Sequence, residues 1–322
     1  MKPVIWIIDD EFDNYDIEKN VIKQELKDAE IIFSGRDFLK ELDTVGKKAD
    51  AVITQISMDI NASVIEKLEH CKIISVYGVG YENVDVEAAS DKGILVANAP
   101  TYCTEDVSDY VIAAIYQCNK TLMEYAKSCK GGPWGAMAAK NLIHRIKGSV
   151  LFIIGLGRIG AAVAEKANVM GMEVLCYDPY VTEETAKKVN VTKVELEEGL
   201  KQADFVSMNM RLTKETEGFA NKRCFELMKP SAYLINASRG GTVNEEDLID
   251  AVKNGWIAGA CLDVLCEEPP KPDNPIINTE GIFVTPHISY LTQSSLDELQ
   301  RTAAENAVNC LLQREVKSII NV

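Results

Sequence analysis

The sequence predicts an α/β protein built from two doubly wound parallel-sheet domains, one inserted in the other. Short apolar runs alternate with amphipathic stretches along the chain, which is typical of parallel strands joined by crossover helices. The alternation pauses near Pro100, restarts at Val150 and ends in a long amphipathic stretch. A chain of 322 residues, 47% of them hydrophobic, is long enough to bury two such cores.

The first hundred residues supply the strands and helices of one domain. The apolar runs that we predict as strands are Pro3–Ile8, Glu30–Phe33, Ala49–Thr54, Lys72–Gly80 and Ile94–Pro100. The amphipathic stretches between them, predicted as helices, are Tyr15–Leu26, Asp37–Val45 and Asn61–Cys71.

A single long helix is predicted next, over Glu105–Ser128, with Thr104 as its N-cap and Gly131 beyond its end. The strands predicted after this connector are Val150–Gly155, Glu173–Asp178, Asp204–Met210, Ala232–Ser238, Gly259–Val264 and Gly281–His287. The last helix, Ser294–Glu315, has no strands after it and should pack on the first half. We therefore expect one domain from residues 1–102 plus 289–322, and an inserted domain from 103–288.

Composition narrows the classes of partner. The formal net charge of -15 and the pI of about 4.8 argue against general affinity for nucleic acid or an anionic membrane, and favour a small-molecule partner. The apolar run Val4–Ile8 is too short for a signal peptide or a membrane span, which predicts a cytoplasmic protein. Nine cysteines occur without CxxC pairs or zinc-ligand spacing, so we expect reduced thiols and no metal site.

The stretch VLFIIGLGRIG predicts a dinucleotide-binding loop and a Rossmann-like domain. Gly155 suits the tight turn, Gly157 lets the backbone approach a pyrophosphate, and Gly160 lets helix and strand pack closely. Asp178 ends the next strand and can accept both ribose hydroxyls of an adenosine, while repelling a 2′-phosphate. The pattern favours NAD over NADP; the alternative is a tight β–α turn without a cofactor.

A second glycine pair, Gly78 and Gly80, follows an earlier strand. Loops at the carboxyl ends of parallel strands are where ligands bind, and glycines there leave backbone N–H groups open to an anion such as a carboxylate. A turn chosen only for a positive φ angle is the alternative.

The three histidines differ in position. His70 ends a predicted helix and is expected to be a surface or capping residue, and His144 lies in an exposed, basic connector. His287 follows the last predicted strand, at the end where such sheets place active sites. It is the best candidate for a general acid or base.

Charged residues follow two other strands. A 2-oxo acid carries a carboxylate and a carbonyl, so its reduction needs a planar cation and a proton donor held together. Arg239 can supply the cation, and either Glu267 or Glu268 can orient His287 and stabilise its protonated form. Each residue alone is more often structural; their shared position at strand ends points to a catalytic site.

From about Ile74 to Leu291 the chain resembles the D-isomer-specific 2-hydroxyacid dehydrogenase family, and the terminal segments fit that family's split substrate domain. The stretches that carry the resemblance are GVGYENVDVEAASDKGILVANAP, GLGRIG, YDP, LMKPSAYLINASRGGTVNEEDL, ACLDVLCEEP and TPHIS.

The resemblance implies a role for individual residues. Arg239 would bind and polarise the substrate, Glu268 rather than Glu267 would partner the histidine, and His287 would be the acid/base. The backbone N–H groups of Val79 and Gly80 would bind the substrate carboxylate, in the cleft between the two domains. The residues that would contact the NAD cofactor are Thr104, Gly155, Gly157, Arg158, Ile159, Gly160, Asp178, Ala237, Asp263 and His287.

Family members are typically homodimers joined through their NAD-binding domains, and the segment 123–145 is the expected contact. The stretch SMNMRLT departs from the family pattern: Asn209 and Arg211 stand where a histidine and a proline are frequent. Arg211 can either pair with Asp178 or soften the exclusion of NADP. Ser289 replaces a frequent glycine or alanine. The identity of the 2-hydroxy acid is not readable from the sequence.

A second class of function is also open. The run CTEDVSDY resembles the branch that includes C-terminal-binding-protein corepressors, in which the same fold acts as a NAD-sensing protein-interaction module. The complete trio of Arg239, Glu268 and His287 favours the enzyme.

Overall fold

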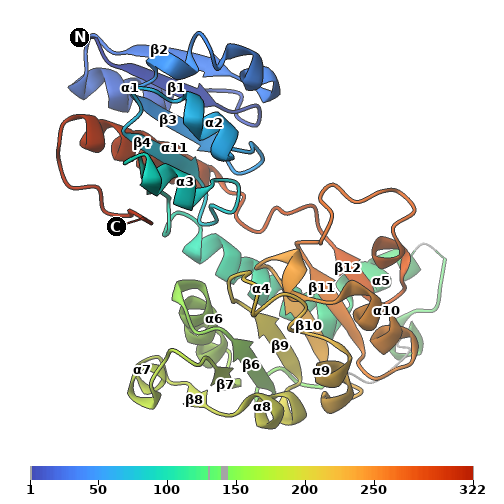
Figure 1. Ribbon diagram of the computed structural model, residues 1–322. Helices are drawn as coiled ribbons and strands as arrows, with labels where there is room; N and C mark the ends of the chain where they lie inside the picture. Colours follow the sequence, from blue (N-terminus) through green and yellow to red (C-terminus); the bar gives the residue numbers. More distant parts are fainter. Residues whose placement is uncertain (1, 130, 139–143, 322) are drawn as a thin grey trace. The chain divides into compact units, whose positions relative to one another are not determined.

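The computed structural model describes residues 2–129, 131–138 and 144–321 and divides into two units. Unit 1 comprises Met1–Cys103 and Thr292–Val322, and unit 2 comprises Thr104–Leu291. Each unit is a parallel sheet with helices on both faces (Figure 1), so the predicted α/β fold with two Rossmann-like sheets is confirmed.

Unit 1 has five parallel strands in the order β2-β1-β3-β4-β5, and they are β1 (Val4–Ile8), β2 (Glu30–Ser34), β3 (Ala51–Gln55), β4 (Ile73–Tyr77) and β5 (Leu95–Ala97). The central strands are buried along their whole length, and such two-sided burial favours β-branched residues. The helices α2 (Ala62–Lys67) and α3 (Val86–Asp91) contribute to one core, with Val64, Ile65 and Ala89.

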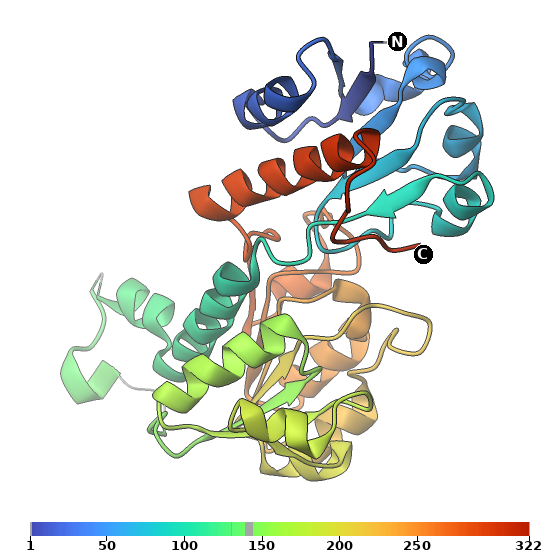
Figure 2. The same ribbon diagram turned by 90° about the vertical axis from the view of Figure 1, so that its left-hand side faces the viewer.

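The C-terminal helix α11 (Gln293–Leu311) packs against α1 (Asp16–Glu25) and against β3 and β4. Figure 2 shows α11, in red, beside the dark blue N-terminal helix. The side chain of Gln300 donates a 2.7 Å hydrogen bond to the Asn14 carbonyl, and Asn306 donates one of 3.1 Å to the Asn98 carbonyl. Residues from both ends of the chain therefore build unit 1.

Unit 2 has seven parallel strands in the order β12-β11-β10-β9-β6-β7-β8. They are β6 (Val150–Ile154), β7 (Glu173–Tyr177), β8 (Thr192–Lys193), β9 (Phe205–Met208), β10 (Tyr233–Asn236), β11 (Gly259–Leu262) and β12 (Ile282–Val284). The helices are α4 (Thr104–Lys120), α5 (Leu122–Ser128), α6 (Arg158–Val169), α7 (Glu183–Lys188), α8 (Leu196–Gln202), α9 (Lys222–Leu227) and α10 (Glu245–Lys253). One core lies between the sheet and α4 with α6, and another lies under α8, α9 and α10.

Three local predictions need correction. The single helix expected over Glu105–Ser128 is interrupted at Thr121, whose φ of 45° lies in the left-handed region, so α4 and α5 are separate. Thr104 is the first residue of α4 rather than its N-cap. The helix expected over Asp37–Val45 is a 3₁₀ helix, Arg36–Glu41.

Within the described ranges, every helix is too short or too polar to cross a bilayer.

Candidate active site

The glycine loop joins β6 to α6, and each glycine has its own steric reason. Gly155 has a φ of 93°, and a Cβ atom there would lie 2.9 Å from the Asn209 backbone. A Cβ on Gly160 would lie 2.3 Å from the Gly155 carbonyl oxygen. Gly157, which precedes α6, has open space where its Cβ would be. The N-terminus of α6 is therefore accessible to an anion.

The carboxylate of Asp178 lies against this loop, directly after β7. Its Oδ2 accepts a 2.9 Å hydrogen bond from the Leu156 N–H, and its Oδ1 accepts one of 2.8 Å from the Tyr180 N–H. Each oxygen retains a second lone pair, so the carboxylate can also accept hydroxyl groups of a ribose. The loop, the helix N-terminus and this acidic residue together fit a dinucleotide.

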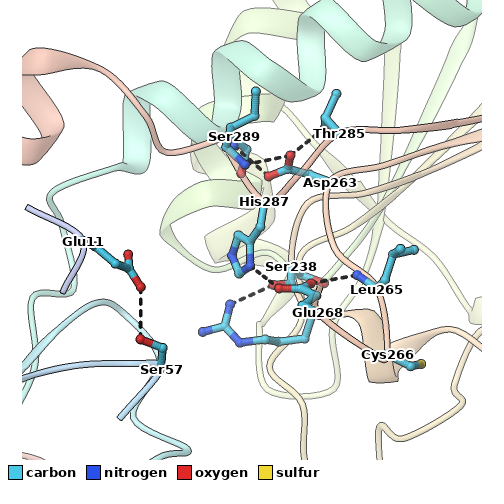
Figure 3. A network of polar contacts seen from close by, with 12 residues as sticks. Glu11, Ser57, Ser238, Asp263, Leu265, Cys266, Glu268, Thr285, His287 and Ser289 are labelled. Atoms are coloured by element: carbon cyan, nitrogen blue, oxygen red, sulfur yellow. Dashed lines mark hydrogen bonds and ion pairs between the residues drawn. The ribbon is translucent and has the colours of Figure 1, made fainter. Parts of the chain in front are cut away.

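His287 and Glu268 are hydrogen-bonded, with Nδ1 of the histidine 2.6 Å from Oε2 of the glutamate (Figure 3). Glu268 Oε1 accepts a 2.8 Å hydrogen bond from the Leu265 N–H. Partial burial raises the pKa of Glu268, but the hydrogen bond and charge of His287, the Leu265 N–H and the charge of Arg239 together lower it below its ordinary value. The carboxylate therefore stays ionised at neutral pH.

Glu267, the neighbouring glutamate, points elsewhere. It is exposed and pairs with Lys271 across 3.3 Å. The structure thus brings Glu268, and not Glu267, to the histidine.

Asp263 anchors the loop that carries His287. Its buried carboxylate accepts hydrogen bonds from the Thr285 hydroxyl at 2.6 Å, the Ile288 N–H at 3.0 Å and the Ser289 N–H at 2.7 Å (Figure 3). Its carbonyl accepts a 2.8 Å hydrogen bond from the His287 N–H. His287 itself has a φ of 54°, a left-handed conformation that a non-glycine residue adopts only when its surroundings fix it. Sequence reasoning found Asp263 but missed this anchoring.

Arg239 lies close enough to Glu268 for its charge to lower the glutamate's pKa. Its Nη1 donates a 2.8 Å hydrogen bond to the Ser238 carbonyl, and its own carbonyl accepts one of 2.7 Å from the Thr242 hydroxyl. The next residue, Gly240, touches the other loop: a Cβ there would lie 2.0 Å from the Leu265 carbonyl carbon. This close backbone contact holds Arg239 and Glu268 on adjoining loops.

The remaining candidates of unit 2 lie at the ends of its strands and helices. Thr104 and Arg158 are the first residues of α4 and α6, Ile159 follows Arg158, and Ala237 follows β10. Among the residues that the structure describes, no three His, Cys, Asp or Glu side chains form a metal-ligand group.

Val79 and Gly80 belong to unit 1 and follow β4. The Val79 carbonyl accepts a 2.7 Å hydrogen bond from the Asn98 side chain. The turn is packed closely, because a Cβ on Gly78 would lie 2.7 Å from Ile56 Cγ2. The next residue after Ile56, Ser57, donates a 3.0 Å hydrogen bond to Glu11, so the loops after β1, β3 and β4 adjoin at one edge of this sheet.

Comparison with known proteins gives consistent results. Residues 112–289 match the family model described as "D-isomer specific 2-hydroxyacid dehydrogenase, NAD binding domain". The chain is 33% identical over 306 residues to D-3-phosphoglycerate dehydrogenase of Archaeoglobus fulgidus, covering 95% of this chain but only 56% of that relative. It is 35% identical over 264 residues to glyoxylate reductase of Korarchaeum cryptofilum, covering 81% of this chain and 80% of the relative.

Among solved structures, the crystal structure of D-lactate dehydrogenase from Aquifex aeolicus, complexed with NAD and lactic acid, matches with a TM-score of 0.85 and 25% identity, covering 99% of each chain. This chain thus spans only about half the length of the Archaeoglobus dehydrogenase, whereas it spans almost the whole lactate dehydrogenase.

Proposed function

The chain belongs to the family of D-isomer specific 2-hydroxyacid dehydrogenases, and from this premise we propose that it transfers a hydride between NAD(H) and a D-2-hydroxy acid/2-oxo acid pair. The observation that carries the proposal is the hydrogen-bonded pair of His287 and Glu268, with Arg239 close enough for its charge to act on Glu268.

His287 is the general acid/base. Its Nδ1 is engaged by Glu268, so Nε2 is the ring nitrogen that can reach a substrate. In the direction of reduction, Nε2–H donates its proton to the developing alkoxide; in oxidation, Nε2 accepts the hydroxyl proton. Glu268 fixes the ring orientation and stabilises the imidazolium that precedes proton donation.

Arg239 binds the substrate. Its planar guanidinium can bind a carboxylate through two parallel hydrogen bonds and polarise the adjacent carbonyl. The compact ammonium group of a lysine cannot form such a paired contact. The backbone N–H groups of Val79 and Gly80 provide the second binding site for the substrate carboxylate.

The residues that hold the cofactor are the glycine loop with α6 and the strand-end residues around it. Bound NAD(H) supplies or accepts the hydride. Asp178 binds the adenosine ribose and disfavours the 2′-phosphate of NADP. The full set consists of Thr104, Gly155, Gly157, Arg158, Ile159, Gly160, Asp178, Ala237, Asp263 and His287.

The substrate is a small 2-oxo acid with one negative charge. The loop after β1 carries Asp9, Asp10 and Glu11, at the same sheet edge as Val79. Partial burial raises the pKa of Glu11, as do the charges of Asp9 and Asp10, against the hydrogen bond of Ser57 and the charge of Arg36. Three carboxyl groups therefore share this edge with one arginine, which pairs with Asp10. A phosphorylated acid brings further negative charge to this edge, so glyoxylate or pyruvate suits it better.

We also propose a homodimer joined through unit 2, in a protein that is cytoplasmic and binds neither nucleic acid nor membrane. Part of the expected contact, residues 130 and 139–143, lies outside the described residues. In the described part, Met123, Trp134 and Met137 are exposed. Such apolar side chains are typical of protein–protein contacts.

The test is a panel of 2-oxo acids with NADH, comparing the wild type with His287→Gln. Oxidation of NADH by glyoxylate or pyruvate in the wild type, and a loss of kcat of at least about a hundredfold in the variant, are expected. Tight NADH binding without turnover of any 2-oxo acid would instead favour the protein-interaction module. Preference for 3-phosphohydroxypyruvate would overturn the proposed substrate class.

A further inference from the structure

A chain of hydrogen bonds, called here the hydroxyl line, connects Tyr110 on α4 through Thr285 to Asp263, which anchors the loop that carries His287. The phenol oxygen of Tyr110, on α4, lies 2.6 Å from Thr285 Oγ1 and 3.6 Å from Cys261 Sγ. Thr285 Oγ1 in turn lies 2.6 Å from Asp263 Oδ1. Tyr110, Thr285 and Asp263 belong to three different segments of unit 2, so the line joins elements far apart in the sequence.

The donors and acceptors in this line can be assigned. An ionised carboxylate only accepts hydrogen bonds, so the single hydroxyl proton of Thr285 goes to Asp263. The Tyr110 hydroxyl must then donate to Thr285 Oγ1, and its own oxygen remains free to accept from the Cys261 thiol. The direction is fixed from Tyr110 to Thr285 to Asp263.

Asp263, the last acceptor of the hydroxyl line, is the residue that anchors the His287 loop. Asp263 accepts from Thr285, Ile288 and Ser289, and its carbonyl accepts from the His287 N–H. His287 has a left-handed backbone, so the direction in which its ring leaves the chain depends on these bonds. Tyr110 attaches this anchored loop to α4, which packs against α6.

We propose that Tyr110 is a positioning residue for His287: its hydroxyl fixes Thr285 and, through Asp263, the backbone that aims the imidazole. The inference rests on the proposed function of His287 as the acid/base. Tyr110 acts on the geometry of proton transfer, and it need not touch substrate or cofactor.

Tyr110→Phe tests the role of the hydroxyl, because the ring and its packing are kept. Tyr233→Phe is the matched control: Tyr233 is also half-buried in unit 2, and its phenol makes no hydrogen bond within the described part of the chain. Thr285→Val interrupts the same line at its middle, and Thr285→Ser keeps the hydroxyl.

The expected kinetic result is a fall in kcat of about five- to tenfold for Tyr110→Phe, because a small misalignment of a catalytic group slows the chemical step. The KM for the 2-oxo acid should change by less than about twofold, since the residues proposed to bind the substrate are not altered. The deuterium isotope effect on kcat with 4-deuterated NADH should rise. Thr285→Val should behave like Tyr110→Phe, and Thr285→Ser should restore most of kcat.

A second readout does not need turnover. The chain has three histidines, so long-range ¹H–¹⁵N spectra of the cofactor-free protein can resolve each ring, with His287→Gln assigning the relevant signal. Tyr110→Phe should move or broaden the His287 ring signals and leave those of His70 and His144 in place. Tyr233→Phe should change none of them.

The outcomes separate the two proposals. If Tyr110→Phe matches Tyr233→Phe in both kcat and ring signals, Tyr110 does not position His287 and the inference is wrong. If His287→Gln retains full turnover, the acid/base assignment fails instead, whatever Tyr110→Phe does to the ring signals.

Discussion

Glu267 and Glu268 are adjacent in the chain but have different surroundings. Glu268 is paired with His287, whereas Glu267 is paired with Lys271 at the surface. Glu268→Gln keeps the shape and removes the charge that stabilises the imidazolium, so kcat/KM for reduction should fall by about tenfold or more. Glu267→Gln should stay within about twofold of the wild type, because a surface ion pair contributes little.

Both effects are measured by steady-state kinetics at neutral pH. The reverse ranking of the two variants would move the histidine's partner to Glu267. Equal and small effects would remove both glutamates from catalysis.

In the proposed function, the choice between NAD and NADP depends on Asp178. Its carboxylate is held against the glycine loop by the Leu156 N–H, where it would repel a 2′-phosphate. Asp178→Ala should raise the NADPH/NADH ratio of kcat/KM at least about tenfold, which corresponds to about 1.4 kcal/mol. An unchanged ratio would direct attention to Arg211.

The residues of the site differ in how far the sequence could predict them. His287, Arg239 and Glu268 follow predicted strands, and parallel strands bring their carboxyl ends to one edge. Tyr110 could not be predicted, because its partner Thr285 is 175 positions away and only the packing of α4 on the sheet brings them together. The choice between Glu267 and Glu268 needed the family motif, because the sequence alone does not show which of two adjacent side chains packs towards His287.

At the level of the elements, two glycines of the loop between β6 and α6 serve different purposes: Gly160 is required for packing, and Gly157 is proposed to be required for cofactor binding. A Cβ on Gly160 would lie 2.3 Å from the Gly155 carbonyl, whereas one on Gly157 meets open space. Gly160→Ala should therefore lower the free energy of unfolding by about 1–3 kcal/mol through overpacking. Gly157→Ala should leave it within about 0.5 kcal/mol.

The affinity for NADH should show the reverse ranking, with the larger effect at Gly157 rather than at Gly160. Gly157→Ala should weaken NADH affinity by about tenfold or more in a folded protein, since in the proposed binding mode the added methyl group would stand in the way of the pyrophosphate. Urea unfolding and NADH fluorescence titration measure the two quantities. Stability loss in Gly157→Ala without loss of affinity would contradict the assignment.

The helix α1 buries a carboxyl group, Glu18, whose Oε1 accepts a 2.7 Å hydrogen bond from the Tyr77 hydroxyl. Burial raises the pKa of Glu18 despite the opposing hydrogen bonds. The folded state therefore binds this proton more tightly than the unfolded state. Its contribution to stability is complete below the ordinary pKa of 4.5 and is lost as pH rises through the raised value.

Glu18→Gln should consequently stabilise the protein at pH 8, by about 1 kcal/mol, and the advantage should shrink towards pH 4. Urea unfolding across this range provides the measurement, with Glu30→Gln, an exposed position at the start of β2, as the control for net charge. A pH-independent difference between Glu18→Gln and wild type would contradict the raised pKa.

Elements that lie in a clear apolar run or amphipathic stretch were predicted even when they are short, whereas β8 and α3 were not. Buried strands such as β3 and β4 are uninterrupted apolar runs, which are easy to recognise. β8 has two residues and α3 has six, too few to establish a period. The interruption at Thr121 lacks a glycine or proline to mark it, so the pattern on either side read as one helix.

For the whole molecule, the proposed homodimer can be tested through exposed apolar side chains of the expected contact. Trp134 and Met137 are 76% and 80% exposed, so replacing both with glutamate should not disturb the core of unit 2. If they lie in the dimer contact, two buried charges per subunit should shift the protein to monomers.

Sedimentation velocity measures this shift, with Val169→Glu, a 90% exposed position on α6, as the control. A wild type that sediments as a monomer would refute the homodimer. A double variant that remains dimeric would place the contact on another surface.

The connectivity of the two units has a consequence for how the protein is made. The chain leaves unit 1 at Cys103 and re-enters it at Thr292, so all of unit 2 is translated before α11. Domains generally fold as units, in the order in which their residues emerge from the ribosome. Unit 2 is complete once Leu291 has emerged. Unit 1 begins first but is completed only when α11 has emerged, so the face of its sheet that α11 covers stays exposed on the nascent chain until then.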